Sequence, residues 1–286
     1  MDVIRAATAQ DAPAIERFLA RHAETSMFLR SNLASHGIGS DHPHGTDFFL
    51  WHKGAALGAV FGATRGGFLL CQMPQADAEA AHSFLHTVQN RAVQGLTGEA
   101  AQVRVLQDAL SFPQAAWRRQ EDEPLFSLEL KDLPASADVN KLRLAGLEDR
   151  IMLADWFRDY QLDTGLSTAG PDLDAQSQAR AEATIHRSDL RLLIEDGVPA
   201  AMVDFNAVMP GLVQVGGVFV PRAQRNRGLG RRVVAARLTQ AYRDGQARRA
   251  ILFAASPAAA RAYAGLGFRQ IGHYRTALLK APRRVQ

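Results

Sequence analysis

The stretch Val213–Gly230, VQVGGVFVPRAQRNRGLG, decides how the rest of the chain is interpreted. An apolar run that ends at Pro221 predicts a strand, a short basic loop follows, and two glycines open a helix over 228–242. A helix N-terminus offers unpaired backbone N–H groups and the positive end of the helix dipole, so this order of elements favours binding of a pyrophosphate. Four arginines add full positive charges at the same place: Arg222, Arg225, Arg227 and Arg231.

Three kinds of phosphate-bearing ligand use a strand, a loop and a helix in this order. A P-loop needs GxxxxGK[ST], with a lysine for the phosphates, and nothing in the chain matches it. A dinucleotide fold needs GxGxxG, but Val233 occupies the position of the third glycine. Coenzyme A fits best, because its pyrophosphate suits the helix N-terminus, its 3′-phosphate suits extra arginines, and its pantetheine arm can pair with a strand edge.

The hexapeptide Arg225–Gly230, RNRGLG, carries a resemblance to a known family. It resembles the Q/R-x-x-G-x-G/A loop of the GNAT superfamily, whose members are acetyl-CoA-dependent N-acetyltransferases. Further on, Ser256, Ala259 and Tyr263 keep the spacing of that superfamily's N-x-x-A-x-x-x-Y, although serine replaces the asparagine. The run YAGLGF that starts at Tyr263 also fits Y-x-x-x-G-F. The resemblance extends over residues 141–279.

The resemblance implies roles for the residues around this loop. The strand before the loop is implied to splay from its neighbour at a bulge, which leaves backbone groups free for pantetheine and the thioester carbonyl. Tyr263 is implied to protonate the departing thiolate, and Ser256 has a shorter reach than the asparagine it replaces. The whole implied cofactor-binding set is Val218, Phe219, Val220, Arg225, Asn226, Arg227, Gly228, Leu229, Gly230, Arg231 and Ser256.

The activity that the resemblance implies is transfer of an acetyl group from acetyl-CoA directly to a primary amine, in a ternary complex and without a metal. The amine has to lose a proton, yet the strand before the loop carries Gln214 and no acid. Three carboxylates remain candidates for the general base: Glu182, Glu195 and Asp204. Two alternatives stay open, namely an acetyltransferase that acts on protein amines and a catalytically silent module that binds acyl-CoA or a protein partner.

The pattern of elements on both sides of this stretch predicts two similar halves. The second half reads as strand, two helices, three strands, helix, strand, helix and closing strands over 268–279. The first half follows the same outline, although 103–110 is compatible with either a strand or a helix. The point equivalent to the glycine loop, after a strand over 67–73, reads PQADAE and lacks both glycines and arginines. We therefore expect the first half to be a degenerate copy that does not bind a pyrophosphate.

These patterns and the resemblance together predict an α+β protein with two tandem GNAT-like domains, each a mixed and mostly antiparallel sheet flanked by helices. The segment 131–140, KDLPASADVN, has no apolar periodicity and is interpreted as a linker. The predicted domains are therefore a degenerate N-terminal domain over 1–130 and an acetyl-CoA-binding domain over 141–286.

Composition narrows the expected partners and compartment. The 286 residues include 33 basic and 29 acidic ones, and a net charge of +4 is too small to indicate nucleic-acid binding. No run approaches the ~20 apolar residues of a membrane helix, and the N-terminus lacks the apolar core of a signal peptide. The single cysteine, Cys71, fits a reducing compartment. We expect a cytoplasmic monomer or homodimer that acts on a small-molecule amine, without nucleic-acid or membrane partners.

Overall fold

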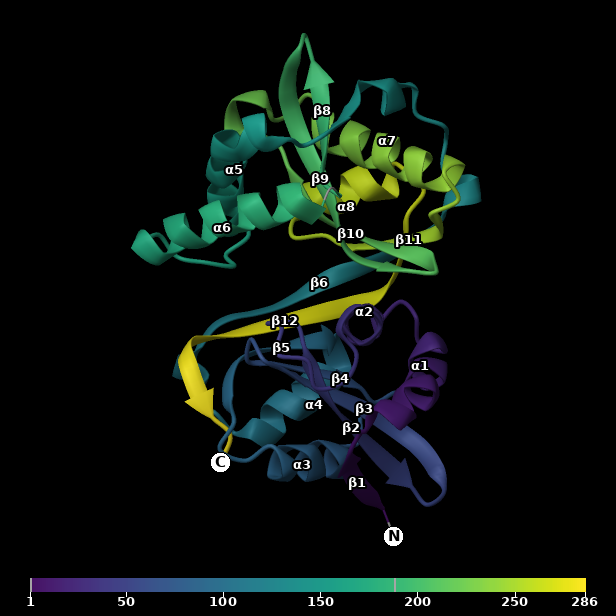
Figure 1. Cartoon of the computed structure of the whole chain (residues 1–286), viewed down its shortest axis with the longest axis vertical. Helices are drawn as coiled ribbons and strands as arrows, with labels where there is room; N and C mark the ends of the chain where they lie inside the picture. Colours follow the sequence, from purple (N-terminus) through teal and green to yellow (C-terminus); the bar gives the residue numbers. More distant parts are fainter. Residues whose placement is uncertain (1, 188) are drawn as a thin grey trace. The chain divides into compact units, whose positions relative to one another are not determined.

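The computed structural model describes residues 2–187 and 189–286, which form two compact units (Figure 1). Unit 1 consists of residues 2–123 together with Gly272–Gln286, and unit 2 is Pro124–Ile271. These bounds differ from the predicted ones, because the chain divides before the expected linker at 131–140 and because the C-terminal segment belongs to unit 1. A sequence pattern assigns a strand to the domain whose residues are nearest along the chain. In the structure, the strands with which it pairs determine the unit to which it belongs.

Unit 1 is a mixed sheet with helices on both faces. Four of its neighbouring strand pairs are antiparallel, and the pair β4–β5 is parallel. Its strands, in their order in the sheet, are β1 (Val3–Ala6), β2 (Thr46–Lys53), β3 (Ala56–Thr64), β4 (Phe68–Gln72), β5 (Ala92–Glu99) and the C-terminal part of β12 (Arg269–Arg284). Its helices are α1 (Ala12–Ala20), α2 (Met27–His36), α3 (Ala78–Thr87) and α4 (Ala100–Leu110).

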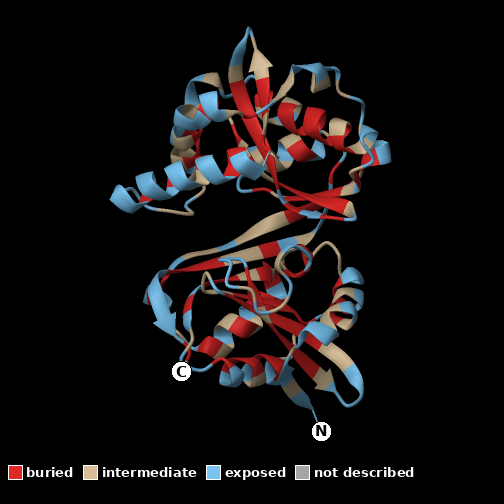
Figure 2. Cartoon of the chain, in the orientation of Figure 1, coloured by how far each residue is buried: buried red, intermediate tan, exposed pale blue. Residues whose placement is uncertain are grey.

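The alternation of apolar residues along β2 explains why both faces of this sheet are covered. Phe48 and Leu50 point into the core with α1 and α2, whereas Phe49 and Trp51 point into the core with α3 and α4. Figure 2 shows the resulting buried residues on the strands and on the inner sides of the helices. Strands that are buried on both faces read as continuous apolar runs, as β2 does.

The segment 103–110, which the sequence left undecided, is part of α4. The helix begins after Glu99, whose carboxylate accepts a hydrogen bond from the N–H of Gln102 at 3.0 Å. Strand β5 before it was not predicted, since its sequence AVQGLTGE has two glycines and little alternation. Both glycines are needed for close packing: a Cβ on Gly95 would lie 2.6 Å from the carbonyl oxygen of Ala277.

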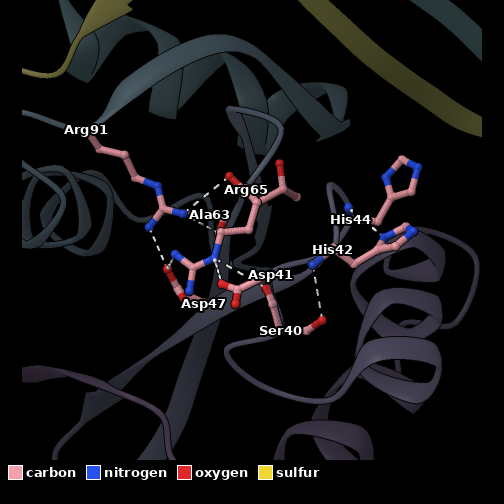
Figure 3. A network of polar contacts seen from close by, with 9 residues as sticks. Ser40, Asp41, His42, His44, Asp47, Ala63, Arg65 and Arg91 are labelled. Atoms are coloured by element: carbon pink, nitrogen blue, oxygen red, sulfur yellow. Dashed lines mark hydrogen bonds and ion pairs between the residues drawn. The ribbon is translucent and has the colours of Figure 1, made fainter.

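An ion-pair network fixes the loop 37–45 of unit 1 to the neighbouring strands (Figure 3). Arg65 donates to the carbonyl oxygen of Ser40 at 3.3 Å and to Asp47 at 3.1 Å. Arg91 donates to the same Asp47 carboxylate at 2.7 Å. One carboxylate thus joins two arginines from different segments.

Three histidines lie together at the base of this loop. The ring centroids of His36 and His42 are 4.0 Å apart and nearly parallel, and His44 lies 5.5 Å from His42. Figure 3 shows His42 and His44 side by side. Within 2–187 and 189–286, no group of three histidine, cysteine or carboxylate side chains has a geometry that could hold a metal ion.

Unit 2 has the same architecture. In sheet order its strands are the C-terminal part of β6 (Trp117–Glu129), β11 (Ala247–Phe253), β10 (Gly211–Phe219), β9 (Val198–Met209), β8 (Arg191–Glu195) and β7 (Leu142–Leu144). Among the described residues of this unit, only β10 and β11 pair in parallel, with a helix connecting them. Its helices are α5 (Arg150–Asp163), α6 (Pro171–Arg187), α7 (Leu229–Arg243) and α8 (Pro257–Ala264).

Each unit receives its last strand from the other half of the sequence. Strand β6 follows α4 of unit 1 along the chain, but its residues Leu125–Glu129 pair with β11 of unit 2. Strand β12 follows α8 of unit 2, but from Tyr274 onwards it pairs with β5 of unit 1. The closing strands expected over 268–279 are therefore a single long strand that completes the sheet of unit 1.

Candidate active site

A bulge in β10 begins the site. Gly216 lies opposite Asp204 of β9 and Phe219 lies opposite Met202, so β10 uses one more residue than β9 between these two pairs. Gly217, inside the bulge, has φ +58°, in the left-handed region that favours glycine. The glycine pair in the quoted stretch therefore marks the bulge that was expected on this strand.

Beyond the bulge, β10 and β11 separate. Their parallel ladder ends where Val215 lies opposite Leu252, and the described residues of β10 after Val215 have no partner in β11. The gap between the two strands forms part of a groove with a volume of about 820 Å³. Residues from α5, the loop after β10, α7 and α8 complete its wall.

Most of the residues singled out from the sequence line this one groove. These are Val218, Phe219, Val220, Arg225, Asn226, Gly228, Leu229, Gly230, Arg231, Ser256 and Tyr263. Arg227 is exposed and does not line it. The contiguous motif and the distant tyrosine are thus brought together by the fold.

The N-terminus of α7 opens onto the groove without a side-chain cap. Asn226 and Gly228 adopt left-handed φ angles of +65° and +71°, which turn the loop into the helix. A Cβ on Gly230 would meet only Val220 among its neighbours, at 3.7 Å, so packing within the protein does not require glycine there. The glycine instead keeps the groove wall open beside the first-turn N–H groups, a geometry that fits a pyrophosphate.

A carboxylate from α5 holds two arginines of the loop. Asp163 accepts a hydrogen bond from Arg222 at 2.8 Å and another from Arg225. Partial burial alone would raise the pKa of Asp163, but the hydrogen bonds from Arg225 and Arg222 lower it overall. Asp163 lines the groove, but no local pattern singled it out, because its segment reads as a loop in the sequence although it ends α5.

The family model of the acetyltransferase (GNAT) family matches residues 151–268. This segment contains every residue that lines the groove. The chain carries a GNAT acetyltransferase domain. The matched segment lies entirely within unit 2.

Solved structures show how far the fold extends beyond the GNAT domain. A GCN5-related N-acetyltransferase from Sphaerobacter thermophilus is 17% identical, with a TM-score of 0.58 over 100% of this chain and 96% of that chain. One from Kribbella flavida is 18% identical, with a TM-score of 0.58 over 92% and 95%. A tandem GNAT protein from the clavulanic acid biosynthesis pathway is 13% identical, with a TM-score of 0.51 over 100% and 99%.

At these identities the likeness establishes the fold, and it confirms the expected α+β architecture of two tandem GNAT-like domains. No curated protein matches the chain. Among the described residues, no helix is long and apolar enough to cross a membrane.

Tyr263 lies in the last turn of α8 of the GNAT domain and is only 8% exposed. Its ring packs in the core beside Phe268, with the centroids 6.1 Å apart, and its edge lines the groove. Tyr263 can therefore both pack in the core and face a ligand in the groove. Ser256 also lines the groove, where its hydroxyl oxygen accepts a hydrogen bond from the N–H of Ala259 at 3.2 Å and caps α8.

The three carboxylates considered as general base lie in different environments. Glu182 pairs with Arg150 at 3.1 Å, and Glu195 pairs with Arg232 at 2.7 Å. None of the three carboxylates is among the residues that line the groove. Asp204 lies opposite Gly216, immediately beside the bulge.

Asp204 is almost completely buried, at 2% exposure. It accepts hydrogen bonds from Arg187 and from the N–H of Phe205, both at 2.8 Å. Burial nevertheless raises its pKa, which makes this carboxylate a stronger base than an exposed aspartate. Of the three candidates, Asp204 alone is adjacent to the strand that forms the groove.

Proposed function

We propose that unit 2 transfers an acetyl group from acetyl-CoA directly to the primary amine of a small molecule. The observation that carries the proposal is the uncapped, glycine-lined N-terminus of α7, which opens onto a groove bounded by two separated strands. Such a helix start suits a pyrophosphate, and a free strand edge suits the amides of pantetheine. Membership of the matched segment in the GNAT family supports acyl transfer in general.

The residues of the groove divide between binding and chemistry. The first-turn N–H groups of α7, with Arg225 and Arg231, hold the phosphates. Backbone groups of Val218–Val220 bind the pantetheine arm. Backbone N–H groups near Phe219 and Val220 stabilise the negative charge that develops on the thioester oxygen. Acetyl-CoA supplies the activated acetyl group as a substrate.

In the transfer itself, the amine nitrogen bonds to the acetyl carbon and the carbon–sulfur bond breaks. The nitrogen loses a proton and the thiolate gains one. Tyr263 is the proposed donor to sulfur, since a phenol can protonate a thiolate whose conjugate acid has a pKa of ~8.5. Asp204 is the proposed final acceptor of the proton from nitrogen, reached through water beside the bulge.

Calorimetric titration with coenzyme A tests the cofactor half of the proposal. Wild type is expected to bind, and Gly230→Val is expected to lose at least about tenfold in affinity, because the side chain narrows the groove where backbone must approach phosphate. Gly170→Val is the matched control, since Gly170 is exposed and does not line the groove. Full affinity in Gly230→Val, or no binding by wild type, contradicts the proposal.

Amine-dependent release of free thiol from acetyl-CoA tests the catalytic half. An enzyme releases thiol only when an acceptor amine is present. Binding of coenzyme A without thiol release across an amine library would indicate a catalytically silent acyl-CoA-binding module instead.

A further inference from the structure

Arg180 in α6 has an unusual environment in unit 2. Its guanidinium carbon lies 4.4 Å from the ring centroid of Phe157 and 5.5 Å from that of Tyr160, so two aromatic side chains of α5 hold it. Burial lowers its pKa, and the side chain is half-buried. Among the described residues, no hydrogen bond or ion pair satisfies its guanidinium.

Neighbouring arginines differ from Arg180 in this respect. Arg187 pairs with Asp204 at 2.8 Å, and Arg158 pairs with Asp174 at 2.8 Å, although both arginines are more exposed. A guanidinium carries five N–H donors, and those of Arg180 keep some contact with solvent, because none of its nitrogens is among the buried polar atoms without a partner. A half-buried guanidinium that two aromatic rings hold, and that has no ion-pair partner among the described residues, is therefore available to an anionic ligand beside the groove.

Tyr160 connects Arg180 to the groove, because its side chain both lines the groove and contacts the guanidinium. Asp163, one turn further along α5, is the residue that holds the loop arginines. Asp204, beside the β10 bulge, interacts electrostatically with Arg180. Arg180 is thus on the bulge side of the groove, away from the loop assigned to the pyrophosphate.

The charges around this point leave an excess of positive charge. Four arginines and three aspartates act on one another pairwise around it: Arg180, Arg187, Arg191, Arg237, Asp189, Asp204 and Asp244. The one fully buried carboxylate, Asp204, already accepts from Arg187. An anion at Arg180 therefore meets a favourable field.

We propose that Arg180 binds an anionic group of the acceptor, so that the substrate is an amine that also carries a carboxylate or a phosphate. The inference rests on the proposed function and names its substrate class. The planar guanidinium, clamped by Phe157 and Tyr160, can donate two parallel hydrogen bonds to either group. The same contact orients the amine toward the thioester beside the bulge.

Matched pairs of amines that differ in the anionic group test this assignment. O-phosphoethanolamine is compared with ethanolamine, β-alanine with propylamine, and lysine with cadaverine. Binding is measured by calorimetry with and without coenzyme A, and acetyl transfer by thiol release. In wild type, at least one anionic member is expected to bind about tenfold or more tightly than its neutral partner. The pair that responds distinguishes a phosphate from a carboxylate.

Variants at Arg180 test whether this residue is responsible for the preference for anionic amines. Arg180→Gln is expected to weaken binding of the preferred anionic amine by about 10- to 100-fold and to leave its neutral partner unchanged. Arg180→Lys keeps the positive charge but cannot donate two parallel hydrogen bonds, so we expect an intermediate loss of affinity for the anionic amine. Arg158→Gln, which breaks an exposed ion pair on α5, is the control and should match wild type. Coenzyme A affinity should be unchanged in all three, which also verifies folding.

The inference is overturned if no anionic amine binds wild type better than its neutral partner, or if Arg180→Gln weakens both members of a pair equally. Failure of the proposed function gives a different result, namely no binding of coenzyme A by wild type. The titrations without coenzyme A still report on the anion site in that case.

Discussion

At the scale of single residues, Asp163 links the acceptor side of the groove to the loop that is proposed to bind phosphate. It holds Arg222 and Arg225, and Arg225 also donates to the carbonyl oxygen of Val220 at 3.1 Å. A carboxylate at this position both orders the arginines and competes with an incoming phosphate for them. Near a solvent-exposed rim we expect the electrostatic repulsion between this carboxylate and the phosphate to be larger than the benefit of ordering the arginines.

Asp163→Asn is expected to bind coenzyme A about three- to tenfold more tightly at low salt, because one repulsive charge near the phosphates is removed. The gain should shrink as ionic strength rises. Calorimetry at two salt concentrations measures it, with Asp174→Asn on α6 as the control. Weaker binding at low salt would indicate that Asp163 acts mainly by positioning the arginines.

Tyr263→Phe is expected to lower kcat by about 10- to 100-fold, the range for loss of a positioned proton donor. Coenzyme A affinity and thermal stability should change little, since the ring still packs beside Phe268. Steady-state kinetics and thermal denaturation provide the two readouts. Unchanged turnover would contradict the assigned proton donation.

The sequence could predict residues of the loop because a contiguous motif determines its own local geometry. Gly228 and Gly230 were identifiable from spacing alone, and Tyr263 from a second motif in register with the first. Asp163 and Arg180 were not identifiable, since their positions depend on how α5 and α6 pack. Arg227 was predicted with its neighbours but is directed away from the groove wall, which spacing cannot reveal.

At the scale of elements, α3 of unit 1 and α7 of unit 2 occupy equivalent places in the order of elements, but their N-termini are capped differently. Asp77 caps α3, and its carboxylate accepts hydrogen bonds from the N–H groups of Glu79 and Ala80 at 2.9 and 3.3 Å. Helix α7 has no side-chain cap. The carboxylate in unit 1 thus takes the place that an anionic ligand could take in unit 2.

Calorimetry should therefore give a single coenzyme A per chain. Asp77→Ala is expected to destabilise unit 1 by about 1 kcal/mol, the usual effect of losing an N-cap. The same variant should bind coenzyme A as wild type does, because the proposed site lies in unit 2. Denaturant unfolding measures the loss of stability in Asp77→Ala. A second binding event in wild type would show that Asp77 does not block the site in unit 1.

At the scale of the whole molecule, the exchange of closing strands is the feature that the sequence could not reveal. The hydrophobic pattern identified strands at both places, but it does not say which neighbour a strand pairs with. Strand β12 contributes Ala277, Leu279 and the following residue Val285 to the core of unit 1. Element order was predictable from periodicity, whereas the domain bounds depend on these non-local pairings.

Truncation after Ile271 is expected to unfold unit 1, since it removes the strand that pairs with β5 along most of its length. The buried side chains it contributes would leave a cavity and an exposed strand edge, which favours aggregation. Proteolysis followed by mass spectrometry should show cleavage concentrated between residues 2 and 123. Protection of that region equal to wild type would contradict the assignment of β12 to unit 1.

The place of β12 after unit 2 in the sequence also has a consequence for biosynthesis. Domains usually fold in the order in which they leave the ribosome, the N-terminal one first. Here unit 2 is continuous and ends at Ile271, whereas the last strand of the unit 1 sheet follows it in the sequence. The nascent first half therefore lacks this strand until residues beyond Ile271 have been translated.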